Sequence, residues 1–126
     1  MNFLQQLYLK LSSIALEEFK GITISTRLIG GKATSPNKLR INFYDESFLD
    51  VWLSKDGDYS YHWEHRAQRG LLHRWDNAPD HSELSTFPEH FHDGSNKVIK
   101  ESSLNPDPEK ALRYVLNFIR HELKKL

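Results

Sequence analysis

Six of the seven histidines lie between residues 62 and 92, which is about a quarter of the chain. They are His62, His65, His73, His81, His90 and His92. Histidine is the side chain whose unperturbed pKa lies near neutral pH, so it transfers protons and binds metals under physiological conditions. This crowding on short, turn-rich sequence indicates a chemical site rather than a purely structural segment.

A short polar motif, Arg-Trp-Asp-Asn, starts at Arg74. On an extended chain Arg74 and Asp76 point to one face, and His73 and Trp75 point to the other. Arg74 offers a planar fork suited to a phosphate, Asp76 could orient an imidazole, and Asn77 could donate to a developing charge. The structural alternative is an Arg–Asp pair that closes a strand beside an Asx-turn at Asn77. The spacing alone slightly favours this structural alternative.

A second motif is His90-Phe91-His92. Two histidines at i and i+2 point the same way on an extended chain, which suits either a pair of metal ligands or a pair of acid–base groups. A metal site would need further ligands, and His81 and Asp76 are available. The structural alternative is two solvated loop histidines with Phe91 packed on the core.

Further candidates could contact a substrate beside these motifs. They are His62, Asn77, Lys97 and the rings of Tyr61, Trp75 and Phe91. His62 and Glu64 are expected on the same strand face, where they could share the cleft. His65 is expected in a solvated turn, and His73 is expected half-buried against aromatic rings.

The elements that must position these residues follow from periodicity. Apolar residues at three- and four-residue steps predict a helix over 3–19, and strands with turns are expected over 21–75. The first strand should bury Ile22, Ile24, Thr26 and Leu28, and a turn is expected around Ser35-Pro36. A histidine-rich loop is expected over 76–96, followed by a short edge strand at Val98-Ile99. A last helix over 107–124 begins with Asp107 as N-cap and Pro108 as its first residue.

These elements predict an α+β domain spanning residues 1–126. Four or five antiparallel strands would form a meander, and the N- and C-terminal helices would pack on one face of the sheet. The other face would remain free for a site or a partner.

Composition limits the classes of function. The 126 residues carry 17 basic and 17 acidic side chains, which argues against tight binding of duplex nucleic acid by the whole surface. The chain has no cysteine, which excludes disulfides, thiolate metal sites and a cysteine nucleophile. The N-terminal residues predict neither a signal peptide nor a transmembrane span, so a cytoplasmic protein is expected.

Three runs of residues resemble the TumE family of toxins from bacterial and archaeal type II toxin–antitoxin modules. The runs are Tyr61-His62-Trp63, Arg74-Trp75-Asp76-Asn77-Ala78-Pro79-Asp80-His81 and Phe87-Pro88-Glu89-His90-Phe91-His92. The resemblance implies a growth-inhibiting toxin that a helix-turn-helix antitoxin neutralises by direct binding. It places the family's polar series on Arg74, Asp76, Asn77, His81, His90 and His92. Asp80 departs from the pattern, which has a second histidine before His81 in many members.

The leading hypothesis is an endoribonuclease that needs no metal or other cofactor. One of His90 and His92 would act as the base, and the other of the two, or His81, would act as the acid. Arg74, with Lys97, would stabilise the charge on phosphate, and Asp76 would orient a histidine.

Two alternatives belong to other classes. The first is a metal-dependent hydrolase or transferase with His81, His90, His92 and Asp76 as ligands. The second is a non-enzymatic interaction module that binds a partner through the exposed sheet face.

Overall fold

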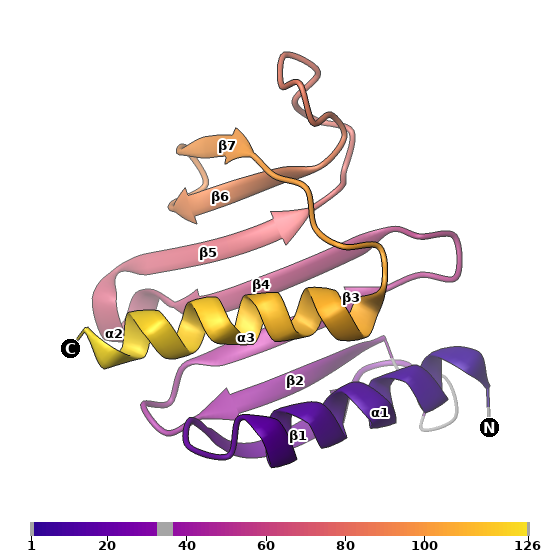
Figure 1. The fold of residues 1–126 in the computed structure, drawn as a ribbon, viewed down its shortest axis with the longest axis vertical. Helices are drawn as coiled ribbons and strands as arrows, with labels where there is room; N and C mark the ends of the chain where they lie inside the picture. The colour runs from indigo at the N-terminus through magenta and orange to yellow at the C-terminus, as the bar shows by residue number, and fades with distance from the viewer. Residues whose placement is uncertain (1, 33–36, 126) are drawn as a thin grey trace.

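The computed structural model describes residues 2–32 and 37–125, so the turn expected at Ser35-Pro36 lies outside the described residues. Two long helices and a short one accompany seven strands (Figure 1). In chain order the elements are α1 (Phe3–Glu18), β1 (Thr23–Ile29), β2 (Lys38–Phe43), β3 (Phe48–Leu53), β4 (Tyr59–His65), α2 (Arg66–Arg69), β5 (Leu71–Asp76), β6 (His90–Gly94), β7 (Ile99–Glu101) and α3 (Pro108–Lys124).

The strands form one antiparallel meander in the order β1 to β7. The predicted meander is confirmed, but the prediction of four or five strands was too low. The additional strand β6 falls inside the predicted loop 76–96, and β7 lies at the expected edge-strand position. Strand β6 was not predicted because its sequence, His-Phe-His-Asp-Gly, is short and mostly polar and lacks the alternation of apolar and polar residues that indicates a strand.

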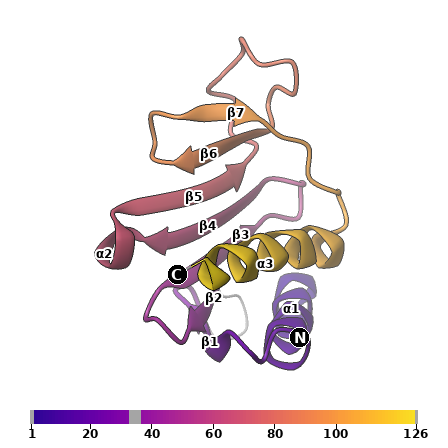
Figure 2. The same cartoon turned by 60° about the vertical axis from the view of Figure 1, so that its left-hand side comes forward.

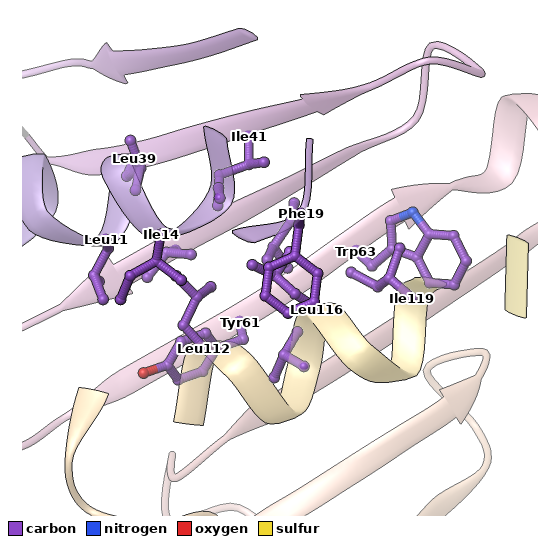
Figure 3. Packing of buried hydrophobic residues seen from close by; sticks show 14 of the residues in the cluster. Leu11, Ile14, Phe19, Leu39, Ile41, Tyr61, Trp63, Leu112, Leu116 and Ile119 are labelled. Carbon is purple, nitrogen blue, oxygen red and sulfur yellow. The ribbon is translucent and has the colours of Figure 1, made fainter. Parts of the chain in front are cut away.

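Both long helices lie on the same side of the sheet, as predicted (Figures 1 and 2). Their apolar faces and the inward residues of β2, β3 and β4 form one core (Figure 3). The fully buried side chains include Leu11, Ile41, Trp63, Leu112 and Leu116. Burial of such side chains stabilises a fold by about 1.5–3 kcal/mol each. This layer holds both long helices against one face of the sheet and leaves the opposite face without a helix (Figures 1 and 2).

The first strand differs from its predicted pattern. Its register shifts between Thr23 and Ser25, which marks a β-bulge or irregularity. Ile24 is therefore 66% exposed instead of facing the core, while Thr26 exchanges a hydrogen bond of 2.6 Å with Ser12 on α1. A bulge moves the alternation by one residue, which periodicity within a single strand cannot reveal.

Another difference concerns His65, which was expected in solvent but is 1% exposed. Its ring stacks on Trp63 with centroids 3.6 Å apart, and His65 Nε2 lies 2.8 Å from Nδ1 of His73. Helix α2 begins directly after His65 and brings Arg69 Nη1 to 3.1 Å from His65 Nδ1. The segment expected to be a polar link contains helix α2, and its Arg69 contacts the buried imidazole of His65. His73 is 6% exposed and packs against aromatic rings.

Helix α3 begins where the sequence predicts. Asp107 Oδ1 accepts a hydrogen bond of 3.2 Å from Glu109 N, and Pro108 occupies the first helical position. Replacing an N-cap aspartate by alanine costs about 1 kcal/mol. We expect Asp107→Ala to lower the free energy of unfolding by about this amount in urea titrations. Asp56→Ala, in the exposed turn before β4, is the control and should leave stability unchanged.

Candidate active site on the open sheet face

The open face carries two rows of polar side chains, because alternate residues of each strand point away from the helices. In one row Arg74 of β5 lies between His62 of β4 and His92 of β6. In the next row Asp76 lies between Ser60 of β4 and His90 of β6. The predicted common face of Arg74 and Asp76 is therefore present, and β6 adds both histidines of the second motif to it.

Asp76 is the centre of this cluster. Its Oδ1 lies 3.0 Å from His90 Nε2, and its Oδ2 accepts a hydrogen bond of 2.9 Å from Arg74 Nε. His92 Nε2 lies 3.8 Å from Oδ2. Oδ1 also accepts a hydrogen bond of 3.0 Å from Ala78 N, so that Asp76, rather than Asn77, forms the Asx-turn. The carboxylate is 10% exposed and thus ties three charged or titratable groups together at the end of β5.

The two histidines of β6 differ in their partners. His90 is buried, and its Nδ1 lies 3.0 Å from the carbonyl oxygen of Pro88 while its Nε2 faces Asp76. A ring with a hydrogen on each nitrogen can donate to both of these oxygens. His92 Nε2 instead lies 3.1 Å from Arg74 Nη2, which can only donate. Burial, together with the charge of Arg74, lowers the pKa of His92, so its ring is neutral at pH 7 with a lone pair at Nε2.

His81 completes the cluster from the loop between β5 and β6. Its ring centroid lies 4.8 Å from that of His90 and 5.9 Å from that of His92. The side chain of His81 is 23% exposed, against 1% for His90 and 5% for His92. His81 is therefore the histidine of the three that solvent and a ligand reach most easily.

The three histidines also meet a geometric condition for a metal site. One ligand atom from each of His81, His90 and His92 lies within 4.8 Å of the others. Three protein ligands with an open fourth position are typical of catalytic zinc. However, Arg74 Nη2 lies 3.1 Å from His92 Nε2, and a guanidinium there opposes a cation. The donor set fits a metal only if Arg74 turns away.

A pocket of about 430 Å³ opens beside the cluster on the same face. Arg74 and Asp76 form one side of it, and Trp52, Ser60 and Asp80 contribute to the rest. Arg74 is 26% exposed. The pocket therefore gives a ligand access to the guanidinium and the carboxylate, which contact His92 and His90 respectively.

The other predicted contact residues have varied positions. Tyr61 and Trp75 are each 2% exposed in the core under α3 and offer no free ring face. Phe91 stacks on Trp75 with centroids 4.6 Å apart. Lys97 is exposed in the turn between β6 and β7.

His62 and Asn77 lie at the edge of the cluster. His62 Nε2 pairs with Glu64 Oε1 at 3.1 Å on the open face, next to Arg74, and burial lowers its pKa. Asn77 Oδ1 accepts from Tyr59 N at 2.9 Å, and Asn77 Nδ2 donates to the carbonyl oxygen of Gly57 at 3.0 Å. Both of its amide atoms therefore hold the turn before β4.

Two features of the site were missed by sequence analysis. Trp52 is 41% exposed at the pocket, although its alternation with the apolar residues Val51 and Leu53 was visible in the sequence. Glu89 accepts a hydrogen bond of 2.8 Å from Tyr59 Oη and thereby anchors the end of the loop between β5 and β6 to β4. Nothing in the sequence pairs these two residues, since they are 30 positions apart.

The fold and the site define a small antiparallel α+β protein with a cluster of histidine, aspartate and arginine side chains on its open sheet face. Residues 14–123, nearly the whole chain, match the family model described as toxin TumE. The chain belongs to this family, as the resemblance of its motifs predicted, and is the toxin component of a toxin–antitoxin module with a cognate antitoxin. No curated protein and no solved structure matches the chain. Within residues 2–32 and 37–125, no helix has the length and apolar content required to cross a membrane.

Proposed function

We propose that this toxin is an endoribonuclease that acts by general acid–base catalysis, and that a helix-turn-helix antitoxin neutralises it. The observation that carries the proposal is the contact of Asp76 with both Arg74 and His90. The same carboxylate lies 3.8 Å from His92 Nε2 and lines an open pocket. A phosphate-binding fork, a base and an orienting carboxylate are the parts that phosphodiester cleavage through a 2′-hydroxyl requires.

The neutral His92 is the base in this scheme. Arg74 turns its Nη2 to a phosphate oxygen, which frees His92 Nε2 to take the proton of the RNA 2′-hydroxyl. The 2′-oxygen attacks phosphorus as the bond to the 5′-oxygen breaks, and His81 donates a proton to this leaving oxygen. The products are a 2′,3′-cyclic phosphate and a 5′-hydroxyl. His90, held between Pro88 and Asp76, is a positioning residue.

A second candidate is a metal-dependent hydrolase or transferase that uses the same histidines. The clustering of ligand atoms from His81, His90 and His92 within 4.8 Å favours it. In such an enzyme a bound metal would polarise the group under attack. A stoichiometric metal in the purified protein, with activity lost on chelation, would support this candidate over the first.

Two experiments test the proposal: induced expression of the toxin in cells, and RNA cleavage by the purified toxin. We expect wild type to arrest growth with RNA fragmentation, and purified toxin to leave 2′,3′-cyclic phosphate ends with and without a chelator. His92→Ala should lower cleavage by about 10²–10⁴-fold, the usual contribution of a base. His121→Ala, an exposed histidine on α3, is the matched control and should retain full activity. Growth arrest with intact RNA would contradict the proposal.

A further inference from the structure

Trp52 is the exposed member of the three tryptophans. Its exposed fraction is 41%, whereas Trp63 and Trp75 are 0% and 2% exposed. It lies on the open face, while its neighbours Val51 and Leu53 are buried in the core. A large ring in solvent loses the free energy that burial would provide. We propose that Trp52 stacks an unpaired base of the RNA, an inference that rests on the proposed ribonuclease function.

The sheet register aligns Trp52 with the candidate catalytic cluster. Trp52 pairs with Ser60 on β4, and Ser60 pairs with Asp76 on β5. Adjacent strands lie about 4.8 Å apart, which puts Trp52 and Asp76 about 10 Å apart at their backbones. The small side chain of Ser60 lies between them, and all three residues line the same pocket. This opening has the size of one nucleotide, with the base at one wall and the sugar-phosphate at the other.

The charges around the pocket set the orientation of that nucleotide. Asp58 and Asp80 line the pocket together with Trp52, and Arg74 is the cation among its lining residues. Carboxylates repel phosphate but accept hydrogen bonds from the amino and imino groups of a base. The base therefore lies toward Trp52, and the phosphate lies at Arg74, whose guanidinium contacts the proposed base His92.

The substrate is accordingly single-stranded. A base that stacks on a side chain must leave its own helix, and proteins that bind single strands use exposed aromatic rings in this way. The pocket is continuous with Arg74 and Asp76, which is the reason to assign it to RNA rather than to the antitoxin.

The binding test uses a single-stranded 2′-O-methyl oligonucleotide, which lacks the free 2′-hydroxyl and is not cleaved. We expect it to quench tryptophan fluorescence, because Trp52 is the ring that solvent reaches. Anisotropy of a labelled oligonucleotide should show binding by Trp52→Ala about tenfold to a hundredfold weaker, and binding by Trp52→Phe close to wild type. Tyr44→Ala removes an aromatic ring that is 53% exposed away from the pocket and should change nothing.

The outcomes separate this inference from the proposed function. If the oligonucleotide quenches the fluorescence of Trp52 but the toxin cleaves no RNA, base stacking is supported and the ribonuclease proposal is contradicted. A cleaving toxin whose Trp52→Ala variant keeps its KM and its affinity would overturn the stacking inference alone. Unchanged RNA affinity with weakened antitoxin binding would also overturn it, and would assign Trp52 to protein docking.

Discussion

Asp76→Asn is expected to abolish toxicity and to lower RNA cleavage by about 10²–10⁴-fold. The amide keeps the size of the carboxylate but removes the charge that bonds Arg74 and faces His90 and His92. An amide also presents a donor to one of these partners, so the orientation of the imidazoles is lost. Cleavage of a labelled single-stranded RNA and growth after induction measure the effect.

Asp50→Asn provides a matched control for Asp76→Asn. Asp50 lies on the same open face, is 13% exposed, and pairs with Arg40 and Lys38. Its neutral variant loses a comparable network, and its cross-strand neighbour is His62 rather than His81, His90 or His92. We expect it to be less stable but fully active. Equal loss of cleavage in both variants would mean that Asp76 has a structural role, and retained cleavage in Asp76→Asn would remove it from the mechanism.

The second large effect is a loss of stability on acidification. His65 accepts a hydrogen bond from Arg69 at Nδ1 and donates from Nε2 to His73 Nδ1, and His73 Nε2 faces Asp93 Oδ1 at 3.4 Å. In this hydrogen-bonded series each ring nitrogen either donates or accepts. A proton added to His65 or His73 would therefore point at a neighbouring hydrogen-bond donor. Burial, with the charges of His73 and Arg69, lowers the pKa of His65 to about 4 despite the nearby carboxylates of Asp45 and Glu64. Burial also lowers the pKa of His73, against the charges of Asp93 and Glu122.

The pH window follows from these lowered values. An unfolded histidine takes up its proton near pH 6.5, whereas folded His65 does so only near pH 4. The stabilisation is therefore complete above pH 6.5 and is lost as the pH falls toward 4. We expect His65 alone to account for about 3 kcal/mol of the loss in free energy of unfolding between pH 7 and pH 4.

Urea titrations at pH 7, 5.5 and 4 measure this dependence. His65→Phe keeps a ring that can stack on Trp63 but cannot titrate, so its stability should fall less steeply over this range. The remaining slope comes from the other histidines with lowered pKa values, namely His62, His73 and His92. Identical slopes in His65→Phe and wild type would contradict the proposed proton coupling.

Local sequence determined the helices and the strand faces of this toxin. Asp107 and Pro108 mark the start of α3 because an N-cap and its first turn are made within a few residues. Likewise, alternation alone placed Arg74 and Asp76 on one face of β5, since side chains of a strand point alternately to its two sides. These properties depend on neighbours along the chain, which is why periodicity and residue type were sufficient to predict them.

The tertiary structure decided which of these residues meet. His90 faces Asp76, and Trp52 aligns with it across two strands, only because of the register of β3 through β6. The same long-range packing buried His65 and made a strand of the histidine-rich segment. Register and burial depend on hydrogen bonds and apolar contacts between residues far apart in the sequence. The residue types of the site could therefore be predicted from the sequence, whereas its geometry depends on the folded sheet.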